Sequence, residues 1–159
     1  HIVMHAMGKI TLFMCAGAIY VAVHKTKVSE LDGLGRKMPV TFICFTIASL
    51  SIIGLPPFGG AWSKWYLLLS AAEAEQLVAI GILMLSSLLN VAYLLSIPGR
   101  AFFAPQKGQA AVSGGVEEAP LFCLVPICVT ALGCIVLFFA AGGLYEYLLS
   151  IPILPEATP

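Results

Sequence analysis

Four ionisable side chains lie within or beside long apolar runs of the sequence, where a charge is costly. They are His1, His5, Lys9 and Lys64. An ionisable group at the centre of a membrane span costs about 3 kcal/mol, and it persists mainly where it faces a bundle interior or a water-filled path. Histidine titrates near neutral pH, and burial disfavours the ammonium form of lysine. The chemistry that these residues could perform is therefore proton transfer.

The first three of these residues recur at every fourth position. At 3.6 residues per turn, His1, His5 and Lys9 share one helix face and form a ladder about 12 Å long. Each step rises about 6 Å, a gap that one bridging water can close. The spacing predicts a water-bridged proton relay. Two alternatives stay open: His1 could snorkel to the headgroups, or His1 and His5 could bind a metal, although no Asp, Glu or Cys completes a ligand set on that face.

Lys64 follows a break in an uncharged run that extends from residue 38 to residue 63. Two prolines without N–H groups and three flexible glycines prevent one regular helix there; they are Gly54, Pro56, Pro57, Gly59 and Gly60. Broken membrane helices expose backbone groups, and transporters place ion sites at such breaks. The competing interpretation puts Lys64 in an interfacial belt with Trp62, Trp65 and Tyr66.

The composition predicts that the whole chain is one transmembrane domain. Of its 159 residues, 60% are apolar and 10% are charged, whereas a soluble domain has about 25% charged residues. Eight Lys and Arg balance eight Asp and Glu, which argues against a nucleic-acid binder. Only helices fit such runs, because a lipid-exposed sheet edge leaves its backbone unpaired and barrel-like alternation is absent. We expect an all-α membrane protein with four or five transmembrane helices.

The spans are expected at residues 1–24, 39–56, 76–98 and 119–145, with a broken-helix segment at 57–72, a loop at 101–118 and a tail at 151–159. Since the chain enters an apolar run directly at His1, we expect it to be the C-terminal part of a longer protein. The cysteines have no C-x-x-C spacing and are expected to be core residues: Cys15, Cys44, Cys123, Cys128 and Cys134. We find no phosphate loop, catalytic triad or paired carboxylates, and expect no enzyme active site and no cofactor.

Three motifs in this order resemble a known family. They are His1-x3-His5-x3-Lys9 with Gly17, then Leu31-Asp-Gly-Leu-Gly35, then Gly54-Leu-Pro-Pro-Phe-Gly-Gly-Ala-Trp-Ser-Lys64. The chain is similar to the proton-translocating antiporter-like membrane subunits of respiratory complex I, membrane-bound hydrogenases and multisubunit sodium/proton antiporters. Within this family it resembles most closely the D-type subunit of the multisubunit monovalent cation/proton antiporter. The likeness covers residues 1 to about 104.

The resemblance implies a fourteen-helix fold with two inverted repeats, each with one broken helix. This chain would then be most of the second repeat plus the last helix, broken at Gly54–Gly60. His1, His5 and Lys9 would match the His/Lys ladder of the tenth helix, and Lys64 the lysine of the broken twelfth. Two departures stand out: the first repeat is missing, and Ala61 replaces the family's aromatic residue at the break.

The sequence thus predicts proton translocation in a multisubunit sodium/proton antiporter of a prokaryotic cell (inner) membrane. Sibling membrane subunits and the lipid bilayer are the expected partners, with protons and sodium as the transported ions. The first alternative is an antiporter-like subunit of complex I or a membrane-bound hydrogenase. The second is a non-conducting scaffold, in which Lys9 and Lys64 are structural donors to backbone carbonyls at the break. Quinone binding has little support, because Trp62, Trp65 and Tyr66 cluster as a belt would place them.

Overall fold

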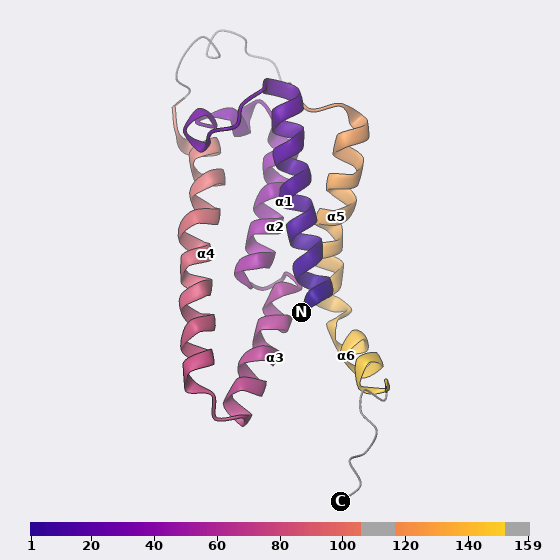
Figure 1. The fold of residues 1–159 in the computed structure, drawn as a ribbon. Coiled ribbons are helices and arrows are strands. Elements are labelled where there is room, and N and C mark those ends of the chain that lie inside the picture. Colours follow the sequence, from indigo (N-terminus) through magenta and orange to yellow (C-terminus); the bar gives the residue numbers. More distant parts are fainter. Residues whose placement is uncertain (106–116, 152–159) are drawn as a thin grey trace, which may run out of the picture.

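The computed structural model describes residues 1–105 and 117–151, and this part of the chain folds into helices and turns (Figure 1). Its α-helices are α1 (Ile2–Val23), α2 (Pro39–Ile53), α3 (Gly60–Glu73), α4 (Leu77–Phe103), α5 (Leu121–Phe139) and α6 (Ala141–Leu149). Two short 3-10 turns, Val28–Glu30 and Leu34–Arg36, connect α1 to α2. Most of the expected loop at 101–118 and of the expected tail at 151–159 lies outside the described residues.

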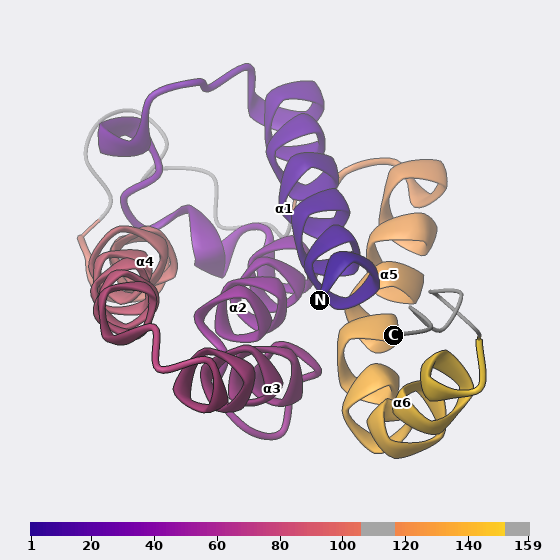
Figure 2. The same cartoon turned by 60° about the horizontal axis from the view of Figure 1, so that its bottom comes forward.

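α2 is the central helix of the bundle. It contacts α1, α3, α4 and α5, and Figure 2 shows it between α1, α3 and α4. Pro39 at its first turn needs no N–H partner there. Its 15 residues rise about 22 Å, less than the roughly 30 Å of a bilayer core. α3 continues beyond its end in the same general direction (Figure 1), so the two helices form one interrupted element.

Three helices, α1, α4 and α5, are long and apolar enough to cross a membrane. Their outward faces carry large exposed apolar side chains such as Phe13, Leu88 and Phe122. Such a surface suits a lipid environment rather than water. The expectation of an all-helical membrane protein is confirmed: the chain is a multi-pass membrane protein.

Two helix boundaries differ from the spans expected from the sequence. α4 continues through Pro98 to Phe103, and the loop between α1 and α2 holds its last turn: Gly33 N–H donates to the Arg100 carbonyl at 3.2 Å. The apolar run at 119–145 divides at Ala140 into α5 and α6. Figure 1 shows α6 leaving the direction of α5 after this point.

Polar contacts fix the end of the bundle that is remote from the α2–α3 break. Arg100 binds Asp32 through two hydrogen bonds of 2.8 and 3.2 Å. The Glu118 carboxylate accepts hydrogen bonds from Val40 N–H at 2.6 Å and Thr41 Oγ1 at 2.8 Å. Glu118 thereby caps the N-terminus of α2, where a negative charge is favourable. The start of α2 and the end of α4 are thus anchored.

The cysteines only partly follow the expectation of core residues. Cys15, Cys44 and Cys134 are buried, Cys123 is half-buried and Cys128 is exposed; all five are free thiols. The Sγ atoms of Cys44 on α2 and Cys128 on α5 lie 4.0 Å apart. Cys128 therefore lies at the edge of the α2–α5 contact rather than inside it.

Candidate functional site

The helix break between α2 and α3 builds the site. α2 ends at Ile53 and is capped by Gly54, whose φ of 91° is the left-handed conformation that favours glycine. Pro56 and Pro57 follow, and Gly59 N–H donates to the Cys134 carbonyl of α5 at 2.9 Å. The turn is thus satisfied by a neighbouring helix rather than left open to lipid.

Gly60 allows α3 to begin very close to α2. A Cβ at this position would collide with the carbonyl oxygen of Ser51. Only glycine fits this approach without movement of the backbone. The first turn of α3 therefore lies directly under the end of α2, and the side chains of Ser63 and Lys64 are within reach of neighbouring helices.

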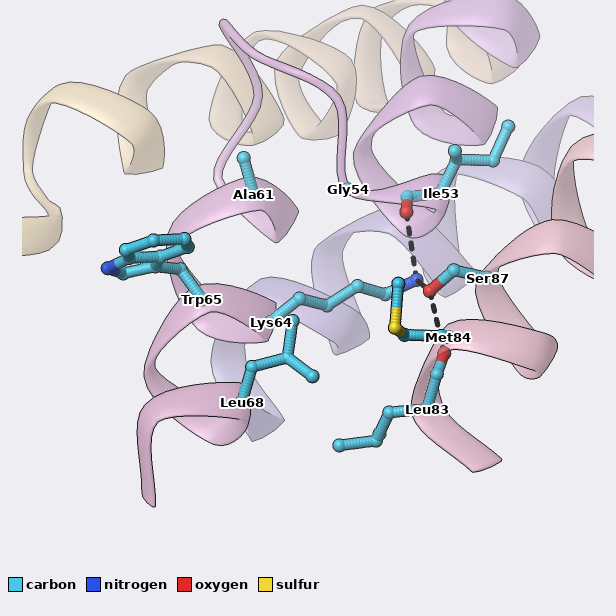
Figure 3. A pocket seen from close by; sticks show the side chains of 9 residues that line it. All are labelled: Ile53, Gly54, Ala61, Lys64, Trp65, Leu68, Leu83, Met84 and Ser87. Carbon is cyan, nitrogen blue, oxygen red and sulfur yellow. Dashed lines mark hydrogen bonds between the residues drawn. The ribbon is translucent and has the colours of Figure 1, made fainter. Parts of the chain in front are cut away.

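Lys64 reaches back across the break to two acceptors (Figure 3). Its Nζ donates to the Ile53 carbonyl at 2.8 Å and to Ser87 Oγ of α4 at 2.7 Å. The Ser87 hydroxyl itself donates to the Leu83 carbonyl at 3.0 Å, so its oxygen is available to accept from the lysine. The Ile53 carbonyl belongs to the C-terminal end of α2, which is the negative end of the helix dipole. The two acceptors and the dipole therefore attract the positive charge of the ammonium.

A cavity of about 310 Å³ adjoins the Lys64 side chain. Nine residues from α2, α3, α4 and the break line it: Ile53, Gly54, Ala61, Lys64, Trp65, Leu68, Leu83, Met84 and Ser87. Its size admits several waters, and Lys64 and Ser87 supply polar partners for them. The small side chain of Ala61 is part of this wall.

The α1 ladder begins beside the same break. His1 and His5 stack with ring centroids 5.3 Å apart. His1 Nδ1 lies 3.0 Å from Ser63 Oγ, and the Ser63 hydroxyl donates to the Gly60 carbonyl at 3.1 Å. The serine oxygen is thus free to accept from the His1 ring, and His1 is joined to α3 one residue before Lys64.

Lys9 lies apart from this hydrogen-bonded group. Its side chain is exposed and hydrogen-bonds none of the described residues, but it borders a cavity of about 230 Å³ between α1 and α4, which Tyr93 and Leu94 also line. Lys9 and Lys64 nevertheless both lie near enough to His5 to interact with it electrostatically. The structure thus brings His1, His5 and Lys64 to the break, and places Lys9 further along α1.

Two serines, Ser63 and Ser87, complete the site, and neither is among the site residues predicted from the sequence. A signal for Ser87 existed in Ser86-Ser87 and Asn90, which interrupt an apolar run. The sequence could not tell which of the two adjacent serines contacts Lys64.

Ser49 of α2 is fully buried, and its hydroxyl has no partner among the described residues.

Two of the three aromatic residues near Lys64 stack on one another along α3 and also contact neighbouring helices. Trp62 stacks on Tyr66 with centroids 6.2 Å apart, and Tyr66 stacks on Tyr145 of α6 at 4.5 Å. Trp65 is 56% exposed. Within the described residues, no group of three or more His, Cys, Asp or Glu side chains is arranged to hold a metal ion.

Comparisons with known proteins agree on one family. The family model described as NADH:quinone oxidoreductase/Mrp antiporter, TM matches residues 1–90. NADH-quinone oxidoreductase subunit N of Desulforudis audaxviator is 39% identical over 86% of the chain. The Na(+)/H(+) antiporter subunit A1 of Staphylococcus saprophyticus is 31% identical over 99% of the chain.

The solved structure of the Mrp complex from Dietzia sp. DQ12-45-1b matches the fold. Its TM-score is 0.77 at 20% identity, and the match covers 90% of this chain and 34% of that one. The chain spans 29% of the length of the subunit N relative and 20% of the subunit A1 relative. These proteins therefore contain much that lies beyond the matched region.

Proposed function

Because this chain belongs to the NADH:quinone oxidoreductase/Mrp antiporter transmembrane family, we propose that it translocates protons as part of a larger antiporter-like membrane subunit. The protons would move by a relay through Lys64, Lys9, His5 and His1, with waters between these groups. The observation that carries the proposal is the position of Lys64: its ammonium lies between a helix-terminal carbonyl and a serine hydroxyl, beside a cavity of about 310 Å³.

The chemistry of the four side chains supports a relay. Lysine and histidine both gain and lose protons, and the Ser63 and Ser87 hydroxyls can accept and donate at once. A proton that leaves Lys64 removes a positive charge from the break, which changes the electrostatic environment of His5. Charge changes at one group are thus felt by the next.

The parent complex and its location complete the proposal. We infer that the chain works with sibling membrane subunits in a cell (inner) membrane, since its relatives include a Na(+)/H(+) antiporter subunit and NADH-quinone oxidoreductase subunits. A role in sodium/proton exchange, in a position similar to that of the D-type antiporter subunit, is the first form of this proposal. A role in a proton-pumping NADH:quinone oxidoreductase is the second, and there the enzyme activity would belong to the complex as a whole.

One observation favours a second function, that of a non-conducting scaffold. Lys64 donates to the Ile53 carbonyl at the break, which is what a purely structural lysine would do. In that case the ammonium stabilises the end of α2 and never releases its proton. The two functions differ in what they require of residue 64: a relay needs a group that can lose a proton, and a scaffold needs only a cationic donor.

The substitution Lys64→Arg separates these functions. Arginine keeps the charge and the donors but does not deprotonate in proteins. The relay predicts loss of proton transport by the full-length complex in membrane vesicles, with normal assembly on a native gel. The scaffold predicts that both transport and assembly persist. Lys25→Arg, in the loop after α1, serves as the matched control and should leave both unchanged.

A further inference from the structure

The proposed relay lacks a direct connection between its two lysines, Lys64 and Lys9. No hydrogen bond joins Lys64 to Lys9 among the described residues, and the two side chains border different cavities. Lys64 reaches α4 through Ser87, and Lys9 borders α4 at Tyr93 and Leu94. Both lysines therefore lie beside α4 at two different heights along its axis, Lys64 at Ser87 and Lys9 near Tyr93.

α4 carries polar side chains between these two heights. Ser87, Asn90 and Tyr93 are spaced three residues apart, so each lies about 4.5 Å along the helix from the next, on adjoining faces. The Tyr93 hydroxyl donates to Asn90 Oδ1 at 2.5 Å. Ser86 beside them is exposed, and the hydroxyl of Ser96, one turn further on, donates to the Tyr93 carbonyl. Ser87, Asn90 and Tyr93 are therefore the polar residues of α4 between the two heights, and we call them its polar stripe.

We propose that the polar stripe Ser87–Asn90–Tyr93 of α4 is the path by which protons pass between Lys64 and Lys9. This inference rests on the relay proposed above and assigns to it three further residues. The Lys64 ammonium gives up a proton to water beside Ser87, a chain of waters and hydroxyls passes it along the stripe, and the neutral Lys9 amine takes it up. One N–H bond breaks at Lys64 and one forms at Lys9, so charge and atoms balance.

The three residues have different parts in this path. The Ser87 and Tyr93 hydroxyls can each accept one proton and donate another. They donate to the Leu83 carbonyl and to Asn90 Oδ1, so each hydroxyl must turn away from that acceptor when it passes a proton along the stripe. Asn90 is a positioning residue: its Oδ1 accepts from Tyr93 and holds the phenol at the cavity that Lys9 also lines, with the lone pairs of the phenol oxygen free to accept from water. Water fills the remaining distances, because the two cavities measure about 310 and 230 Å³.

The test compares single-atom changes in the full-length complex, with proton transport measured in membrane vesicles. Tyr93→Phe removes one oxygen from a side chain that is 53% exposed, so the fold has little reason to change. We expect transport to fall at least tenfold in Tyr93→Phe and in Ser87→Ala. Ser87→Thr restores a hydroxyl and should recover most of the transport, which a purely structural loss of packing would not show.

Ser86→Ala is the matched control, because Ser86 is exposed on α4 beside Ser87 and outside the stripe. It should transport protons at the wild-type rate, and all variants are checked for assembly. Lys64→Arg, measured in parallel, tests the relay separately from the α4 path. If Lys64→Arg abolishes transport while Tyr93→Phe and Ser87→Ala are normal, the relay stands and the α4 path is overturned. If Lys64→Arg transports normally, the relay itself fails and the path fails with it.

Discussion

The close approach of α3 to α2 leads to a sharp prediction for the substitution Gly60→Ala. The added Cβ would collide with the carbonyl oxygen of Ser51, and it would also lie 2.8 Å from the carbonyl carbon of that residue. Both atoms belong to the backbone of a central helix, so no side chain can rotate away. α3 must therefore move away from α2 if the variant folds at all.

The expected loss of unfolding free energy in Gly60→Ala is the difference between two opposing effects. Overpacking of a well-packed site costs about 1–3 kcal/mol, and a collision with backbone belongs at the upper end of this range. Against it, alanine is favoured over glycine inside a helix by about 1 kcal/mol. The net loss is then about 2 kcal/mol, which reduces the ratio of folded to unfolded protein by roughly thirtyfold. The shift also lengthens the bonds of Lys64 to Ile53 and Ser87, so proton transport should fall.

The assay is thermal unfolding of the purified full-length protein in detergent, together with proton transport in vesicles. Gly81→Ala in α4 is the matched control, because nothing lies within 4 Å of a Cβ at that position. This variant should melt at or slightly above the wild-type temperature and transport protons normally. Equal melting temperatures for Gly60→Ala and Gly81→Ala, with equal transport, would refute the close-approach argument.

Three further predictions concern the bundle away from the break. Asp32→Asn removes the negative charge that pairs with Arg100, so the melting temperature should fall. High salt should shrink the difference from wild type, and a difference that salt leaves unchanged contradicts this. Glu118→Ala removes the cap of α2, which should cost about 1 kcal/mol of unfolding free energy, whereas Glu117→Ala should cost less. The Sγ atoms of Cys44 and Cys128 lie 4.0 Å apart, so oxidation with copper phenanthroline should join them in a disulfide. The disulfide is measured as a loss of maleimide labelling, and replacement of either cysteine by serine must prevent it.

The part of the fold that the sequence predicted is the part determined by local rules. Pro39 at a helix start, and the glycines and prolines of the break, act through backbone geometry that any structure must respect. The stacking of His1 on His5 likewise follows from their four-residue spacing on one helix. Such features need no knowledge of the neighbouring helices.

What the sequence could not predict depends on contacts between distant segments. α4 passes the expected stop at Pro98, and Gly33 holds its last turn, a contact across more than sixty positions. The partner of Lys64 was undecided between two adjacent serines, since the rotation of α4 about its axis is set by packing. The exposure of Lys9 also depends on which segments pack against α1. No local pattern encodes any of these facts.

The break has a further role beyond that of ending a helix. Successive residues of a helix point about 100° apart, so Ser63 and Lys64 cannot face the same neighbour. Because α3 starts close beneath α2, Ser63 meets His1 of α1 and Lys64 meets Ser87 of α4. An unbroken helix would carry these residues further along its own axis and leave the α2 carbonyls bonded internally. The interruption therefore supplies the free Ile53 carbonyl that accepts from Lys64. It also shifts the start of α3 relative to α2, so that one turn of α3 contacts α1 through Ser63 and α4 through Lys64.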